Sequence, residues 1–372
     1  MTNIDLIEVS GAPRARGEQY GEAARAKIEQ AIAFYAEAFV AHSAVSWAEV
    51  TERAKLWMPL VEQFAPDLVE ELHGIAAGAD VSPLDVLALN ARGDIVHDRA
   101  FASVDPAQEE GCSSYALLPE ASGDGKVYCG QNWDWLAGVQ NTTVALRVHQ
   151  PPKPTVITVV EAGQVGRQGA NSTGVAVNAN GLGGRFDNSI GVPQTFIRRR
   201  ILDSTSFGEA LQVPITARQQ IAANLLLTHA DGVAVDLETT PGRHHWLYPD
   251  DDLLVHTNHY IDWVPDQLRT SYRPTSPSSL YRLPLLRKGL QRCRSTDDST
   301  ETVKLVAESL RNHFGYPNAL CCHPDENEVP LKQSQTLTSS IVDLTDGVFW
   351  VTQGPPCQSD FVALPWNIYT TS

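Results

Sequence analysis

The spacing of apolar residues changes from a helical to a strand period near residue 112. Before that point, apolar residues recur at steps of three and four positions: Ala24, Ile28, Ile32, Tyr35 and Phe39. This spacing predicts an amphipathic helix. Two more helical segments follow at 60–79, where Pro66 punctuates the pattern, and at 81–95. We therefore expect residues 1–111 to be mainly helical.

After residue 112 the apolar pattern has a period of two. Val144, Leu146 and Val148 alternate with other residues, and 339–354 has the pattern of a hairpin that turns at Asp346-Gly347. Helical stretches interrupt the strands at 194–212, 278–291 and 300–314, and proline-rich stretches at 151–154 and 274–284 suggest loops. This order is typical of an α+β protein in which two sheets pack face to face and helices cover both.

Composition narrows the function classes. The chain has 372 residues and a net charge of -16, which disfavours nucleic acid or an anionic membrane as a partner. No stretch approaches the roughly 18 apolar residues of a membrane span, and the N-terminal region lacks the apolar core of a signal peptide, so we expect a cytoplasmic protein. The run Arg198-Arg199-Arg200 suggests a solvated helix face.

The six cysteines have no repeating spacing, which suggests neither a disulfide framework nor a zinc site. The pairs His244-His245 and Cys321-Cys322, the second followed by His323, do not have the spacings usual for zinc ligands. We therefore expect no metal and no other cofactor.

The junction Gly111-Cys112 carries the most specific chemistry. A free thiol has a pKa of roughly 8.5 and needs a base to become a thiolate at neutral pH, and an α-amino group with a pKa of roughly 7.7 to 8.0 can serve. Cleavage of the 111–112 peptide bond would create that amine on Cys112 itself. Gly111 suits such a step because its carbonyl is open to attack and its backbone tolerates strain.

Five motifs in order carry a resemblance to a known family. They are GCSSYALLP from Gly111, GQNWDW from Gly130, GQVG from Gly163, NSTGVAVNAN from Asn171, and VHTNHY from Val255. Together they resemble the isopenicillin N acyltransferase family of the N-terminal-nucleophile hydrolase superfamily. The resemblance implies a four-layer αββα sandwich, self-cleavage before the cysteine, and transfer of an acyl group from an amide or thioester to water or an amine.

The resemblance also assigns residues. Cys112 becomes the nucleophile, Asp134 matches the family's site aspartate, and Asn258 matches an asparagine that helps to form the oxyanion hole. Six further residues are candidates for the substrate pocket: Ser113, Asn132, Trp133, Asn178, Asn180 and His259. An arginine of the penicillin-forming members falls at Gln333 here, which argues against penicillin as the substrate more than against the chemistry.

Domain organisation follows from the same junction. We expect residues 1–111 to form a helical α subunit that stays bound after cleavage, and residues 112–372 to form a β subunit that carries the αββα core. The partners expected are a small amide or acyl substrate, the two fragments themselves, and possible further copies of the chain.

Two alternatives remain open at this stage. The chain could be a non-catalytic relative that binds a ligand, since fold does not guarantee function. It could also be a papain-like cysteine peptidase that pairs Cys112 with His256 or His259 and needs no cleavage.

Overall fold

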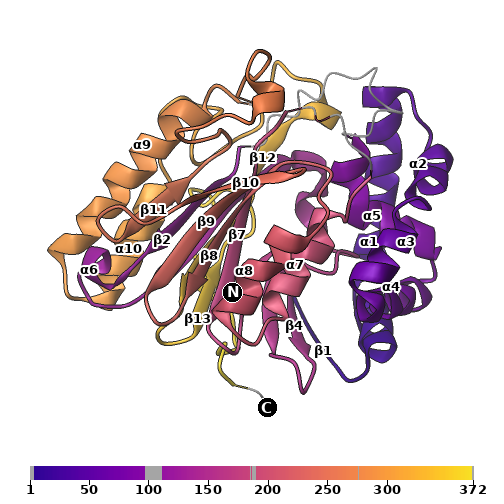
Figure 1. Cartoon of the computed structure of the whole chain (residues 1–372), viewed down its shortest axis with the longest axis horizontal. Helices are drawn as coiled ribbons and strands as arrows, with labels where there is room; N and C mark the ends of the chain where they lie inside the picture. Colours follow the sequence, from indigo (N-terminus) through magenta and orange to yellow (C-terminus); the bar gives the residue numbers. More distant parts are fainter. Residues whose placement is uncertain (1–3, 97–110, 185, 187–189, 275, 371–372) are drawn as a thin grey trace.

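The strands of this protein form two stacked sheets with helices on both outer faces. The computed structural model describes residues 4–96, 111–184, 186, 190–274 and 276–370. In this part of the chain, the layers run helix, sheet, sheet, helix (Figure 1). The α+β fold class and the αββα arrangement expected from the sequence are thus confirmed.

The first sheet has eight strands among the described residues. In spatial order they are β1 (Asp5–Ser10), β4 (Thr143–His149), β5 (Val156–Glu161), β6 (Gln168–Asn171), β7 (Val175–Gly181), β8 (Ala223–His229), β9 (Val233–Thr240) and β10 (Arg243–Leu247). β1 pairs parallel with β4, and the other neighbours are antiparallel. The segment before residue 112 therefore supplies an edge strand as well as helices, which the apolar spacing did not predict.

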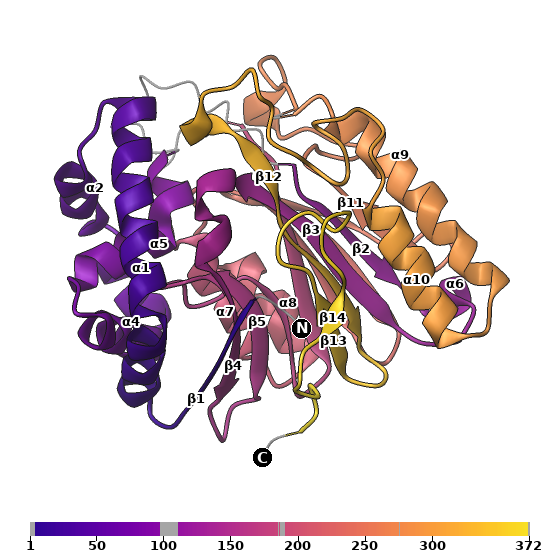
Figure 2. The ribbon, with the colours of Figure 1, turned by 180° about the vertical axis from the view of Figure 1, so that it is seen from behind.

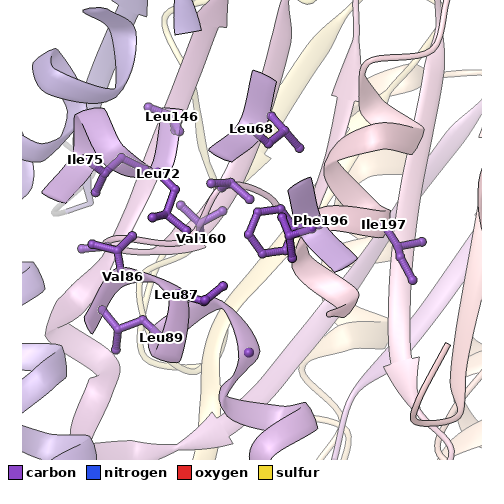
Figure 3. Packing of buried hydrophobic residues seen from close by; sticks show 14 of the residues in the cluster. Leu68, Leu72, Ile75, Val86, Leu87, Leu89, Leu146, Val160, Phe196 and Ile197 are labelled. Carbon is purple, nitrogen blue, oxygen red and sulfur yellow. The ribbon is translucent and has the colours of Figure 1, made fainter. Parts of the chain in front are cut away.

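Among the described residues, seven helices lie on the outer side of this sheet. They are α1 (Pro13–Ser43), α2 (Trp47–Ala54), α3 (Met58–Phe64), α4 (Pro66–Ala79), α5 (Pro83–Val96), α7 (Gln194–Leu202) and α8 (Phe207–Thr216). Figure 3 shows how Leu72 of α4, Val86 of α5 and Val160 of β5 meet in one buried cluster. Alternation along β4 explains the packing, because Val144 and Leu146 face these helices while Ala145 faces the other sheet.

The second sheet has six strands in the described part of the chain. Their spatial order is β11 (Leu253–His256), β2 (Ser113–Leu117), β3 (Tyr128–Leu136), β12 (Ser334–Asp343), β13 (Val348–Val351) and β14 (Val362–Ala363). Two helices cover its outer face, α9 (Ser279–Leu290) and α10 (Ser299–Leu310), as Figure 2 shows from behind. β2 and β3 pair antiparallel, which brings the residues just before β2 next to the end of β3.

Short elements complete the described chain. They are α6 (Pro119–Ser122) and the 3-10 helices η2 (Ala137–Thr142), η3 (Asp266–Leu268), η4 (Gln291–Ser295) and η5 (Pro330–Lys332). Small buried residues line the space between the two sheets, among them Ala116, Ala145, Ala170 and Ala176. Their size lets the sheets approach closely.

Several local expectations are confirmed, and two are wrong: one concerns the 274–284 stretch and the other the arginine run on α7. α4 begins at Pro66, where a proline fits the first helical position, and the hairpin of β12 and β13 turns at the expected Asp346-Gly347. The 274–284 stretch is not all loop, because α9 begins at Ser279 and includes Pro284.

The arginine run on α7 is not a solvated face. Arg199 is fully buried and forms ion pairs with Glu71 of α4 at 2.7 Å and with Asp203 at 2.9 Å. These carboxylates compensate the charge, which is the condition under which an arginine can be buried. The Glu71 contact also ties the N-terminal helices to the rest of the molecule.

Within the described residues, no single helix combines the length and apolar composition of a membrane span, although the bent pair Pro66–Ala79 and Pro83–Ile95 meets both criteria when taken together.

Candidate active site

Cys112 lies directly before β2, an interior strand of the second sheet, at the N-terminal end of that strand. Its side chain is buried, with 3% exposed, and its Sγ lies 3.5 Å from the backbone oxygen of Asp134. This contact follows from the pairing of β2 with β3, in which Ser113 lies opposite Asn132. The structure therefore brings the first two motifs of the sequence together at one point.

The carboxyl group of Asp134 lies against Gly111, the residue before the cysteine. A Cβ atom at position 111 would lie only 2.5 Å from Oδ2 of Asp134, so any larger residue here would displace the Asp134 side chain. Oδ1 of Asp134 accepts a hydrogen bond from Thr336 of β12 at 2.6 Å, whereas Oδ2 is buried with no hydrogen-bond partner among the described residues. Burial raises the pKa of Asp134 to about 7, although the Thr336 hydrogen bond and the charge of Arg282 lower it.

Arg282 of α9 is the central cation of the site. Its guanidinium is fully buried, and the two hydrogens of Nη1 are shared among three acceptors around the junction: the backbone oxygen of Gly111 at 2.5 Å, the backbone oxygen of Cys112 at 2.8 Å and Oγ of Ser113 at 2.8 Å. Nε donates to Oγ of Ser278 at 3.0 Å. Burial lowers the pKa of Arg282, while attraction to Asp134 and Cys112 opposes that effect. The guanidinium is therefore aimed at the carbonyl of the 111–112 peptide bond.

Arg282 was not among the residues expected from the sequence. A signal was present, because Arg282, Leu286 and Leu290 recur at four-residue steps and all three are buried. A charged residue on the apolar face of a helix needs buried partners, and here the partners are the backbone around Cys112.

Asn258 follows β11 and is fully buried. Its Oδ1 accepts from Nη2 of Arg282 at 2.9 Å, its Nδ2 donates to the backbone oxygen of Gly181 at 3.0 Å, and its backbone N–H donates to Oγ of Ser279 at 2.7 Å. Because a guanidinium has only donors, the contact with Arg282 fixes which end of the Asn258 amide is oxygen. Arg282 thus links Asn258 to the backbone of Gly111 and Cys112.

Two of the pocket candidates lie close to the junction. Ser113 accepts a hydrogen bond from Arg282, as described above. Trp133 is fully buried, and the guanidinium carbon of Arg167 lies 3.8 Å from the centroid of its ring. Burial and repulsion from Arg198 and Arg92 lower the pKa of Arg167 to about 9, while Glu161 and Cys112 oppose this shift.

Of three other candidates, two hold neighbouring backbone segments and the third contacts a buried thiol. Nδ2 of Asn132 donates to the backbone oxygens of Leu310 and Leu320 at 2.9 and 2.7 Å. Nδ2 of Asn180 donates to the backbone oxygen of His256 at 2.9 Å and to that of the next residue. Asn178 is buried and interacts with the thiol of Cys129.

The two histidines of the VHTNHY motif have partners other than Cys112. His256 is fully buried, with Nε2 at 2.9 Å from Oε1 of Glu238 and Nδ1 at 2.8 Å from the backbone oxygen of Thr257. The acidic partners raise the pKa of His256 although burial lowers it. Nδ1 of His259 lies 2.7 Å from Oγ of Ser279, and burial lowers the pKa of His259 to about 4.

Gln333, the position of the replaced arginine, lies at the end of η5 just before β12. Its Nε2 donates to the backbone oxygen of Asp325 at 3.0 Å, and its own backbone oxygen accepts from Ala137 at 2.8 Å. The side chain thus holds a loop beside the start of β12.

Comparison with known proteins gives three kinds of match. The family model of acyl-coenzyme A:6-aminopenicillanic acid acyl-transferase matches residues 121–357, a range that includes Asp134 and Asn258 and begins after Cys112. The acyl-coenzyme A:6-aminopenicillanic-acid-acyltransferase 40 kDa form of Emericella nidulans is 27% identical over 371 residues, which is 98% of each chain.

Solved structures give looser matches. Penicillin V acylase from Agrobacterium tumefaciens has a TM-score of 0.42 and 14% identity, with 65% of this chain and 83% of that chain covered. A variant of conjugated bile acid hydrolase from Clostridium perfringens has a TM-score of 0.47 and 12% identity, with 70% of this chain and 94% of that chain covered. The Caenorhabditis elegans ortholog of N-acylethanolamine-hydrolyzing acid amidase has a TM-score of 0.42 and 14% identity, with 63% of this chain and 93% of that chain covered.

The family match spans more than half of the chain, and the Emericella nidulans relative aligns over nearly all of it. On this basis the protein belongs to the acyl-coenzyme A:6-aminopenicillanic acid acyltransferase family, which is named for acyl transfer.

Proposed function

We propose that this protein is a self-processing cysteine amidohydrolase or acyltransferase. Cys112 cleaves the 111–112 bond, becomes the N-terminal residue, and then takes the acyl group of a small N-acyl amide, short peptide or acyl thioester. The observation that carries this proposal is the hydrogen bond from Arg282 to the carbonyl oxygen of Gly111. A buried cation on that oxygen is expected if the carbonyl is to be attacked.

Self-cleavage begins with the thiol of Cys112. Its sulfur attacks the carbonyl carbon of Gly111, and the developing negative charge on that oxygen is stabilised by Arg282. The C–N bond then breaks, the sulfur keeps the acyl group as a thioester, and the nitrogen of Cys112 takes up a proton. Water hydrolyses the thioester and leaves a carboxylate on Gly111, a free thiol and a free α-amine.

Charges near the sulfur support its role as nucleophile. Arg282 and Arg167 both interact electrostatically with Cys112. Positive charge near a cysteine favours the thiolate, which is the reactive form. Asp134, whose pKa is raised to about 7 and whose Oδ2 lies beside Gly111, can supply the proton that the departing nitrogen needs.

Turnover reuses the same atoms. The freed α-amine of Cys112 acts as the base, the thiolate attacks the substrate carbonyl, and an amine or thiol leaves. Arg282 holds Oδ1 of Asn258 and fixes the orientation of the amide, so one hydrogen of Nδ2 is donated to Gly181 and the second is the proposed oxyanion donor. Water or an acceptor amine then removes the acyl group.

The two fragments are expected to stay together after cleavage. β1 pairs with β4 of the other fragment along Asp5–Ser10. Two buried ion pairs also cross the boundary, Arg92 with Glu161 and Glu71 with Arg199. The two fragments also share one apolar core, in which Leu72 and Val86 pack with Val160, and dissociation would expose that surface to water.

The partners of the histidines argue against a cysteine-histidine pair. Both ring nitrogens of His256 are engaged, by Glu238 and by a backbone carbonyl, and His259 interacts with Ser279. An α-amine on Cys112 needs no such partner.

Mass analysis of the denatured protein tests the proposal. We expect two fragments, residues 1–111 and 112–372, from the wild type and from the matched variant Cys293→Ala, which changes another buried cysteine. Cys112→Ala should remain intact and inactive. An intact and active wild type would favour the papain-like alternative, an intact and inactive one the binding-protein alternative, and a cleaved Cys112→Ala would show that an external protease acts.

The substrate class is tested with the cleaved enzyme. N-acyl amino acids, acyl amines and acyl thioesters would be offered with and without an acceptor amine, and the products separated by mass. Release of free acid indicates hydrolysis, and an acylated acceptor indicates transfer. A cleaved protein that acts on none of them would contradict the proposed substrate class.

A further inference from the structure

A group of two cysteines and two histidines lies outside the site described above. His313, Cys321 and His323 come from the segment between α10 and β12, and Cys357 comes from the segment between β13 and β14. Their ligand atoms all lie within 4.8 Å of one another. We refer to these four residues as the Cys2His2 cluster.

The distances in the Cys2His2 cluster are those of a tetrahedral metal site. Nε2 of His323 lies 3.2 Å from Nε2 of His313, 3.5 Å from Sγ of Cys321 and 3.3 Å from Sγ of Cys357. Zinc bonds of roughly 2.0–2.1 Å to nitrogen and roughly 2.3 Å to sulfur, at tetrahedral angles, separate two nitrogens by about 3.3 Å and nitrogen from sulfur by about 3.5 Å. The three distances from His323 therefore fit zinc, and the remaining ligand atoms, which all lie within 4.8 Å of one another, need to approach only slightly.

Hydrogen bonding alone does not account for this arrangement. Nε2 of His323 carries either one hydrogen or one lone pair, yet three polar atoms converge on it. A cation at the centre of the four atoms satisfies all of them.

The cluster is also accessible. Cys321 and His323 are buried, whereas His313 and Cys357 are exposed. A surface hollow of about 400 Å³ is lined by residues that include His313, Cys357, Arg311 and Asp360. A metal ion can therefore enter from solvent.

We propose that His313, Cys321, His323 and Cys357 bind one Zn²⁺ ion as a structural site. Zinc is favoured because two thiolates and two imidazoles in tetrahedral geometry select it over harder cations. Four protein ligands leave no open position for substrate or water, which is typical of structural rather than catalytic zinc. The ion fastens the segment after β13 to the segment after α10.

The zinc site supports the segment that holds Asp134. The backbone N–H of Cys322 donates to Oγ1 of Thr336 at 3.0 Å, and Thr336 donates to Oδ1 of Asp134. The backbone oxygen of Leu320 accepts from Asn132. Both contacts come from residues that flank Cys321, so the metal would hold in place the backbone that orients β3.

The sequence did not indicate this site because its ligands lack the usual spacings. His313 and Cys321 are separated by seven residues, and His323 and Cys357 by 33 residues. Folding brings them together because β12 and β13 form a hairpin that returns the chain to the segment after α10.

Metal analysis of the untagged full-length protein, purified without chelators, tests the proposal. We expect one zinc per chain in the wild type and in Cys293→Ala, whose cysteine lies outside the Cys2His2 cluster. Cys357→Ser and His313→Ala change exposed ligands, which limits the risk of unfolding, and should weaken zinc binding by about 100-fold or more.

Cobalt gives a second readout that needs no variant. After removal of zinc with a chelator, Co²⁺ should produce the visible d–d absorption of a tetrahedral site together with a thiolate charge-transfer band, neither of which the colourless zinc form has. Absence of both zinc and this spectrum, a disulfide between Cys321 and Cys357 in the freshly purified protein, or unchanged affinity in Cys357→Ser would each overturn the proposal. None of these results depends on the proposed enzymatic activity.

Discussion

Nη2 of Arg282 donates a hydrogen bond to Oδ1 of Asn258 at 2.9 Å. The other terminal nitrogen of the same guanidinium donates to the backbone oxygen of Gly111. One buried cation thus contacts the carbonyl at the proposed cleavage point and orients the amide proposed to act in turnover. The two proposed reactions therefore share Arg282.

The first prediction concerns Arg282→Gln. Loss of the cation from the Gly111 carbonyl should slow self-cleavage by about 10² to 10³-fold, as for the loss of one oxyanion donor. The rate is measured as the fraction of intact chain against time after synthesis. The matched control is Arg287→Gln on the same helix, which removes a partly exposed arginine and should cleave normally.

Folding must be checked separately, because Arg282 is buried. Its removal leaves several acceptors without a donor and can cost about 3–5 kcal/mol. Arg282→Lys keeps the charge with fewer donors and should be intermediate in cleavage rate. Normal cleavage in a folded Arg282→Gln variant would contradict a role for this residue in the self-cleavage step.

The second prediction concerns Asn258. Asn258→Ala should lower kcat by about 10² to 10³-fold with little change in KM, because an oxyanion donor acts mainly in the transition state. Steady-state kinetics on the cleaved variant measures this. A higher KM with unchanged kcat would instead make Asn258 a substrate-binding residue.

The third prediction concerns the histidines. His259→Ala should cleave itself and turn over substrate at close to the wild-type rate, since its ring interacts with Ser279 and its pKa is lowered to about 4. His256→Gln should mainly lower the melting temperature, because it removes a buried partner of Glu238. Complete loss of activity in a folded and cleaved variant of either histidine would favour a cysteine-histidine mechanism.

The sequence predicted those parts of the fold and site that depend on local pattern. Each such pattern lies within a single helix or strand. The structure confirms the buried helix face that contains Ile28 and Tyr35, and it confirms that Val144 and Ala145 face opposite sides of their strand. The Gly111-Cys112 junction was informative because it combines a nucleophile with a residue that has no side chain to obstruct it.

Residues that act through long-range contacts were not predicted. Arg282 reaches the backbone of Gly111 across 171 positions of the chain, and the Cys2His2 cluster joins two separate segments. The strand Asp5–Ser10 was missed because its identity depends on pairing with β4 rather than on its own composition. Burial of the arginine run on α7 was missed for the same reason, since Glu71 is far from Arg199 in sequence.

The last prediction concerns the pH dependence set by Asp134. Its carboxyl has an ordinary pKa of 3.8 and a pKa raised to about 7 in the folded chain, mainly by burial. Between these values the folded state holds a proton that the unfolded state has lost, so stability falls as pH rises. The contribution is fully present below about pH 4 and lost above about pH 7, and three pKa units correspond to about 4 kcal/mol.

Asp134→Asn removes this dependence, because the amide is uncharged at every pH. We expect the variant to be more stable than its parent at pH 8 by about 2–4 kcal/mol, and the difference to shrink towards pH 5. Urea unfolding of both chains in the Cys112→Ala background, where neither is cleaved, measures the effect. Asp94 and Asp236 have pKa values raised in the same direction, but they are common to both chains and cancel in the comparison.

With Cys112 present, Asp134→Asn should slow self-cleavage, because the amide cannot deliver a proton to the departing nitrogen. A stability difference that does not change with pH, together with cleavage at the wild-type rate, would show that the carboxyl of Asp134 neither holds a proton near neutral pH nor takes part in the reaction.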